Sequence, residues 1–169
     1  MTTPFARRAL LAGLTLAALS GAALAHHGWR SFDSARAYYI RGEIQEVRWG
    51  NPHTLVDLSV DATDLPEGFR ARATPPGGDE ATAAATLASA RPYGGEQTRL
   101  RLVLAGPGWM ARWGLERPLE PGEQIEVLGF LSAAEAEELR PVMFWLADGQ
   151  GVWQQLTSLP TPPEPAPAD

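Results

Sequence analysis

The sequence predicts an all-β protein, mainly strands with one short helix, folded as a small, partly open OB-like barrel. Several short segments alternate apolar and polar residues and are separated by turn residues, which is typical of half-buried strands. These segments come in the order three strands, a short helix, then two or more strands. The first strand also carries a change of phase that indicates a bulge and strong curvature. Periodicity does not distinguish this barrel from a small β-sandwich, which remains the alternative.

Residues 39–49 are expected to form the first strand. Its apolar positions fall at Ile40 and Ile44 and then change phase before Val47. Because side chains alternate between the two faces of a strand, such a change requires an extra residue in the ladder. We therefore expect a bulge near residues 45–46.

The second strand is expected at residues 54–60, where Val56, Leu58 and Val60 share one face. It follows the Gly-Asn-Pro sequence of residues 50–52, whose residue types are typical of turns. The first two strands are thus predicted to form a hairpin.

The third strand is expected at residues 99–104, where leucines alternate with polar or smaller residues. A short helix is expected at residues 108–115, because Trp109 and Trp113 then share one helical face. The remaining strands are expected at residues 124–131, 142–146 and 152–155.

The chain of 169 residues is expected to contain a cleaved signal peptide and one folded domain. The signal peptide comprises residues 1–25 and the single β-rich domain residues 26–159. Within the domain, residues 61–97 are rich in Pro, Gly, Ala and Thr and are expected to form a long mobile loop. The Pro-rich tail, residues 160–169, is expected to be disordered.

The N-terminus has the three parts of a secretory signal. Arg7 and Arg8 supply the positive charge, residues 9–19 the apolar run, and Ala23 and Ala25 the small residues of the cleavage site. The apolar run is shorter than the roughly 20 residues that a spanning helix needs, so no stable membrane anchor is expected after cleavage. The mature protein is expected to be periplasmic or secreted, exported by either the Sec or the twin-arginine route.

Composition excludes several classes of function. All 14 basic residues are arginines, and loss of Arg7 and Arg8 with the signal leaves 12 of them against 20 acidic residues, a net charge of −8. This charge argues against nucleic acid as a partner. The chain has no cysteine, which excludes disulfides and thiolate metal sites.

No nucleophile elbow, phosphate-binding glycine loop, zinc-protease motif or dinucleotide fingerprint is present, so a binding role is expected rather than an enzymatic one.

Five sequence features occur together, in order, over most of residues 26–155. They are His26-His27-Gly28-Trp29, Phe32-Asp33, Gly42 to Val47, Trp49-Gly50-Asn51-Pro52-His53 and Leu119-Glu120-Pro121-Gly122-Glu123. Through them the chain resembles the exported bacterial family called domain of unknown function 6152. The resemblance implies a compact periplasmic or secreted β-domain and implies nothing about a reaction.

The three histidines that follow the signal peptide are candidate metal ligands. Cleavage after Ala25 would make His26 the new N-terminus, directly followed by His27. An α-amine beside an imidazole forms a chelate that suits Cu(II), which prefers nitrogen ligands in square or tetragonal geometry. Copper is then held either by the amine and imidazole of His26 together with His53, or locally by His26 and His27 alone.

Other interpretations of the histidines stay open. His26 and His27 can lie in a frayed chain end, with His53 bonded to the backbone of its turn. Zinc or another ligand is a further alternative to copper. Met110 and Met143 could ligate Cu(I), although such residues more often fill gaps in a core.

A second class of function rests on the tryptophans, six in all. Large rings can serve burial in a small core that lacks disulfides, or they can form a face that stacks on sugars or meets a protein. The candidate ligand face consists of Trp49, Asn51 and Trp109. On this interpretation the partner is a glycan, another small ligand or an envelope protein, and no metal is needed.

Overall fold

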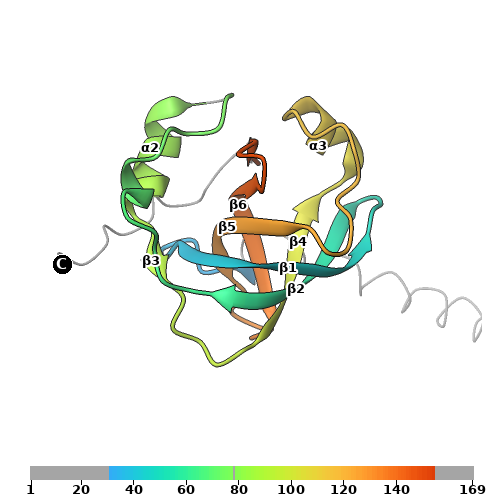
Figure 1. Ribbon diagram of the computed structural model, residues 1–169, viewed down its shortest axis with the longest axis horizontal. Helices are drawn as coiled ribbons and strands as arrows, with labels where there is room; N and C mark the ends of the chain where they lie inside the picture. The colour runs from blue at the N-terminus through green and yellow to red at the C-terminus, as the bar shows by residue number, and fades with distance from the viewer. Residues whose placement is uncertain (1–30, 78, 155–169) are drawn as a thin grey trace, which may run out of the picture. The chain divides into compact units, whose positions relative to one another are not determined.

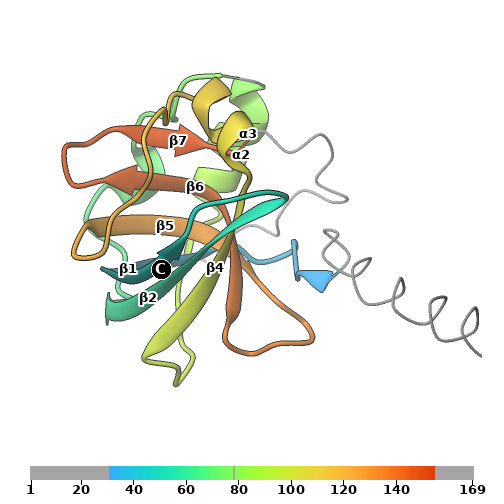
Figure 2. The same cartoon turned by 90° about the vertical axis from the view of Figure 1, so that its right-hand side faces the viewer.

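A computed structural model describes residues 31–77 and 79–154. Everything described below belongs to the compact unit that begins at Phe32. Five strands form the closed barrel (Figures 1 and 2). They are β1 (Tyr38–Arg48), β2 (His53–Ala62), β4 (Arg99–Ala105), β5 (Gln124–Leu131) and β6 (Glu138–Leu146).

The sheet closes on itself because β1 pairs with strands on both of its sides. Around the barrel the order is β1, β2, β4, β6, β5, and β5 pairs again with β1. Neighbours are antiparallel except β4 and β6, which run parallel and pair at only two positions. The all-β barrel is confirmed, and the sandwich alternative is wrong because one sheet surrounds the core.

The bulge expected in the first strand is confirmed. The β1–β2 register shifts between Ile44 and Glu46, and again between Arg41 and Gly42. At Gly42 the two strands approach so closely that a Cβ atom would lie 1.9 Å from the carbonyl oxygen of Ser59. The extra residue and the missing side chain allow β1 to curve around the core and pair on both edges.

Strand β6 is longer than the sequence predicts, since it begins at Glu138 and not near Val142. A proline within a strand argues against a central position, because it cannot donate to the ladder. Pro141 is accommodated because it faces Gly129 of β5, next to a register shift. A Cβ at Gly129 would lie 2.9 Å from the Cα of Pro141, so glycine is needed for this close approach.

Residues 61–97 are not the long irregular loop that their composition predicts. They contain the 3₁₀-helix η3 (Phe69–Ala71), the helix α2 (Glu80–Ala88) and the short strand β3 (Arg91–Pro92), which pairs in parallel with β1. The side chain of Asp79 caps α2 by accepting a hydrogen bond from the N–H of Ala81.

The segment is folded by contacts with the barrel and not by a strong local pattern. Phe69 is buried against Tyr39 of β1 and Trp145 of β6, with ring centroids 4.6 and 5.5 Å apart. Leu87 and Tyr93 are also buried. Single apolar residues spaced this widely give no helical or strand period, which explains why the sequence suggests a loop.

Helix α3 (Pro107–Arg112) confirms the predicted helix, and β7 (Gly151–Trp153) extends the sheet beside β6. In both views α2 and α3 lie at the same end of the barrel (Figures 1 and 2). The barrel interior is filled mainly by aliphatic side chains, together with Phe144 and Met110. Met143 is also buried. No helix in the described part of the chain has the length and apolar character needed to cross a membrane.

Candidate binding site at the Trp49–His53 turn and helix α3

The turn between β1 and β2 lies against the residue that precedes α3. A Cβ placed on Gly106 would lie 2.3 Å from the side-chain oxygen of Asn51 and 3.0 Å from the carbonyl oxygen of Pro52. The β2–β4 ladder brings these segments together, because His53 is paired with Ala105. Two stretches more than 50 residues apart therefore form one surface, which includes Asn51 and the start of α3.

His53 is partly buried at the beginning of β2. Its Nδ1 atom lies 3.3 Å from the carbonyl oxygen of Leu104. A carbonyl oxygen only accepts, so this contact requires a hydrogen on Nδ1, and in the neutral ring the lone pair is then on Nε2. The backbone partner of His53 thus belongs to β4, across the ladder, and not to its own turn.

The other two predicted metal ligands, His26 and His27, lie outside the described residues. Among residues 31–77 and 79–154, no group of three or more His, Cys, Asp or Glu side chains is arranged to hold a metal ion. Of the three histidines, His53 is the one that lies within the described residues. Met110 is buried in the core, as expected of a residue that fills space.

Trp109 differs from the other tryptophans because its side chain is exposed. It is 53 % exposed, and no other large hydrophobic side chain among the described residues is exposed. It stacks on Trp113, with ring centroids 5.8 Å apart and planes inclined by 26°. The guanidinium of Arg112 lies over its ring, 4.8 Å from the centroid. We call these three residues the Trp109 platform.

The remaining described tryptophans serve the core to different degrees. Trp145 and Trp153 are each 6 % exposed. Trp49, which the sequence places on the ligand face, is partly buried and packs against the core cluster, as does Trp113. Asn51 is exposed beside the start of α3. Of the three predicted ligand-face residues, Asn51 and Trp109 present exposed surface, whereas Trp49 is partly buried against the core.

Helix α3 begins and ends at residues suited to those positions. Pro107 occupies the first turn, where its fixed φ and missing N–H are favourable. Gly114, just beyond the helix, has φ +94°, a left-handed conformation that glycine adopts without strain. Its carbonyl oxygen accepts a 2.6 Å hydrogen bond from the side chain of Gln150, in the β6–β7 turn. The C-terminal end of α3 is thereby attached to the sheet.

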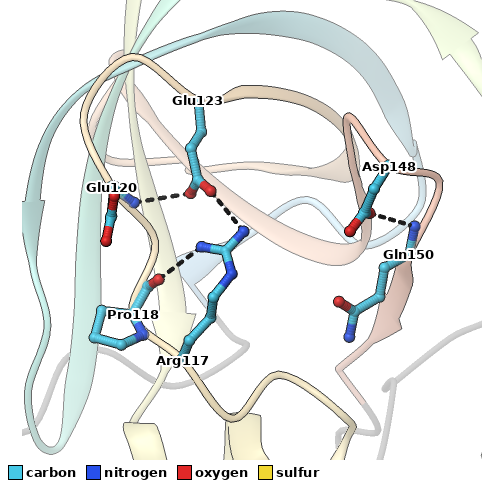
Figure 3. Close-up of polar contacts among 6 residues, drawn as sticks. All are labelled: Arg117, Pro118, Glu120, Glu123, Asp148 and Gln150. Atoms are coloured by element: carbon cyan, nitrogen blue, oxygen red, sulfur yellow. Dashed lines mark hydrogen bonds and ion pairs between the residues drawn. The ribbon is translucent and has the colours of Figure 1, made fainter.

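The connection from α3 to β5 is fixed by the polar contacts shown in Figure 3. Arg117 forms an ion pair with Glu123, N–O distance 2.5 Å, and donates a 2.9 Å hydrogen bond to the carbonyl oxygen of Pro118. Glu123 also accepts a hydrogen bond from the backbone N–H of Glu120. Burial acts to raise the pKa of Glu123, but the Arg117 guanidinium and this N–H outweigh it and hold the pKa below its ordinary value.

The same turn, residues 119–123, is anchored to β1 at its bulge. The N–H of Gly122 donates to the carbonyl oxygen of Ile44 at 2.7 Å, and the N–H of Ile44 donates to that of Glu123 at 2.9 Å. Residues 42–47 and 119–123, far apart in the sequence, are therefore in direct contact. This contact holds the linker after α3 on the barrel wall.

The site is chemically suited to binding. It offers an indole, a guanidinium and a carboxamide, none of which exchanges protons near neutral pH, together with the imidazole of His53. Sequence reasoning did not identify Arg112 as part of it. The spacing of three residues between Trp109 and Arg112 in a predicted helix is the signal that would have found it.

Comparison with known proteins finds similarity to one family and indicates no activity. No curated protein and no solved structure matches this chain. Residues 13–68 match the family of unknown function DUF6152, a range that includes the Trp49–His53 turn but neither α3 nor residues 119–123. Over that part of its length, the chain is similar to the DUF6152 family.

Proposed function

We propose that this protein is a non-catalytic binding domain that captures a protein partner through the Trp109 platform. The observation that carries the proposal is the 53 % exposure of Trp109, on a helix fixed to the barrel at both ends. Exposed tryptophan on a rigid support is unfavourable for a protein with no partner, and Trp and Arg are enriched among residues that dominate binding energy. The expected export of the chain makes an envelope protein the proposed partner.

The contacts of Trp109 favour a protein over a glycan. A sugar ring binds tryptophan by stacking on an open face of the indole. Trp113 is already stacked on Trp109, and Arg112 already lies over its ring. A protein can instead use the exposed ring together with Arg112, for example by placing an apolar pocket and a carboxylate opposite them.

A photo-crosslinker at position 109 tests the proposal in cells. We expect a discrete adduct when p-benzoylphenylalanine replaces Trp109, and none when it replaces Glu67, an exposed residue outside α3. Once the adduct is identified by mass spectrometry, binding of the purified partner should weaken at least about 30-fold on Trp109→Ala, the effect typical of a hot spot. Arg112→Gln should weaken it less, and a chelator should leave it unchanged.

Two results would contradict this function. One is an identical adduct pattern from positions 109 and 67, which would indicate non-specific contact. The other is binding on a glycan array that is lost on Trp109→Ala, which would replace the protein partner by a sugar. Arg99→Gln serves as the matched variant, since Arg99 is an exposed arginine of β4 outside the candidate site and the protein partner should not require it.

We also propose a second candidate function, copper binding by His53 together with His26 and His27. It is supported by the contact of Nδ1 with the Leu104 carbonyl oxygen, because histidines that ligate metals commonly donate their other ring N–H to a carbonyl. Titration of the processed chain with Cu(II) should give an EPR spectrum with several nitrogen ligands. Either His53→Ala or an added residue before His26 should change that spectrum, and an unchanged spectrum in both variants would exclude this site.

A further inference from the structure

A cleft of about 520 Å³ lies on the barrel where residues 72–73 pass over strands β1, β5 and β6. This volume is in the range of sites for small molecules. Its polar or aromatic lining side chains are Arg41, Arg72, Gln124, Glu126 and Trp145. None of them belongs to the Trp109 platform, so the cleft is a separate candidate site.

One wall of the cleft is aromatic. Trp145 is 6 % exposed and packs edge-on against Phe69. Arg72 lies over both rings, 4.9 Å from the centroid of Phe69 and 5.0 Å from that of Trp145. The indole N–H of Trp145 makes no hydrogen bond with the described residues. The wall therefore presents the planar guanidinium of Arg72, backed by the two aromatic rings, beside an unused indole donor.

The charges in the cleft leave one cation without a partner. Arg72 forms an ion pair with Glu126, whose charge also raises the pKa of the buried Tyr39. Arg41 faces Glu126 across the β1–β5 ladder, yet no carboxylate of the described residues lies within ion-pair distance of its guanidinium. The lining thus carries one net positive charge, on an exposed arginine at the edge of the cleft.

From this arrangement we propose that the cleft binds a small organic carboxylate. The carboxylate would receive a bidentate contact from Arg41, because the planar guanidinium matches its two oxygens. The flat body of the ligand would lie against the guanidinium of Arg72, whose side chain is 32 % exposed and covers the ring of Trp145. A single unpaired guanidinium balances the single charge of a carboxylate, whereas a phosphate dianion would need a second cation.

Binding of benzoate, followed by NMR of the tryptophan indole N–H resonances in the full chain, tests the site. Trp145→Phe assigns the resonance of Trp145. Benzoate should shift that resonance saturably, with a Kd on the order of 1 mM for so small a ligand. Arg41→Gln should raise the Kd at least about 10-fold. Arg41→Lys should raise it by less, because lysine keeps the positive charge but cannot make the bidentate contact of the guanidinium.

Matched controls separate the charge from non-specific effects. Arg99→Gln removes an exposed arginine of β4 that does not line the cleft and should leave the Kd unchanged. Benzyl alcohol should bind far more weakly than benzoate. Equal binding of the alcohol would overturn the role of charge, and equal binding of inorganic phosphate would overturn the carboxylate assignment. Absence of any saturable shift up to about 20 mM would overturn the site itself, without affecting the Trp109 platform.

Discussion

Gln154 accepts, at its side-chain oxygen, a 2.7 Å hydrogen bond from the backbone N–H of Ala105. Its side-chain nitrogen donates a 2.6 Å hydrogen bond to the carbonyl oxygen of Pro141. Ala105 ends β4 and Pro141 lies in β6, neighbouring parallel strands that pair directly at only two positions. The buried side chain of Gln154 thus joins β4 to β6 where these two strands no longer pair directly.

Gln154→Leu should therefore destabilise the barrel strongly. It leaves a buried N–H and a buried carbonyl without their partner, which should lower the free energy of unfolding by about 2–4 kcal/mol. Urea unfolding followed by tryptophan fluorescence measures this change. Gln45→Leu, at an exposed position of β1, is the control and should cost less than about 1 kcal/mol. Equal losses in the two variants would show that Gln154 does not bridge the strands.

Thr54→Val should stabilise the protein. Thr54 is 0 % exposed, and its hydroxyl has no hydrogen-bond partner among the described residues. Replacing an unsatisfied buried hydroxyl by a methyl group should raise the free energy of unfolding by about 1 kcal/mol. Thr86→Val is the matched control, because the buried hydroxyl of Thr86 donates a 2.8 Å hydrogen bond to Thr82. Chemical denaturation should show opposite signs for the two substitutions, and the same sign would contradict this account.

Stability should fall at alkaline pH because of Tyr39. Burial, reinforced by the charge of Glu126, raises the pKa of Tyr39 from 10.0 to about 12. Below pH 10 the phenol is protonated in both states, so its contribution is fully present. Between pH 10 and 12 the unfolded chain ionises first, and folding should weaken by about 1.4 kcal/mol at pH 11.

Tyr39→Phe isolates this effect. Phenylalanine does not titrate, so the variant should lose about 1.4 kcal/mol less than the wild type between pH 8 and pH 11. Denaturant unfolding at the two pH values gives the difference, and the difference in tyrosinate absorbance near 295 nm between wild type and variant gives the pKa of Tyr39. Parallel losses in wild type and variant would show that another group governs alkaline unfolding.

Gly106→Ala should disturb the Trp49–His53 turn. The new Cβ would lie 2.3 Å from the side-chain oxygen of Asn51, and such overpacking should cost about 1–3 kcal/mol. Asn51→Ala removes that oxygen, so the double variant should recover part of the loss. A double-mutant cycle should give a coupling of at least about 0.5 kcal/mol.

Gly108→Ala is the control for this cycle. It lies within α3, and a Cβ there would meet nothing within 4 Å. Alanine favours helix over glycine, so this substitution should be neutral or slightly stabilising. Additive effects of Gly106→Ala and Asn51→Ala would mean that the turn and the start of α3 are not in contact.

The sequence predicts only some of the residues of the candidate site. Asn51 and His53 stand out as members of one turn, and Trp109 and Trp113 as one face of a short helix. Nothing in the sequence shows that this turn meets Gly106, because that contact depends on the β2–β4 register. The sequence does not predict the cleft beside Trp145, because the composition of residues 61–97 is typical of a loop.

The sequence by itself determined where most strands lie, the bulge in β1 and the helix that carries Trp109. These features depend on neighbours along the chain, through side-chain alternation, turn residues and helical spacing. Tertiary structure alone decided the closure of the barrel, the place of Pro141 in β6 and the packing of Phe69 against Tyr39 and Trp145. Each of these depends on groups far apart in the chain, whose contacts leave no period in the sequence, because they become favourable only when the whole sheet has formed.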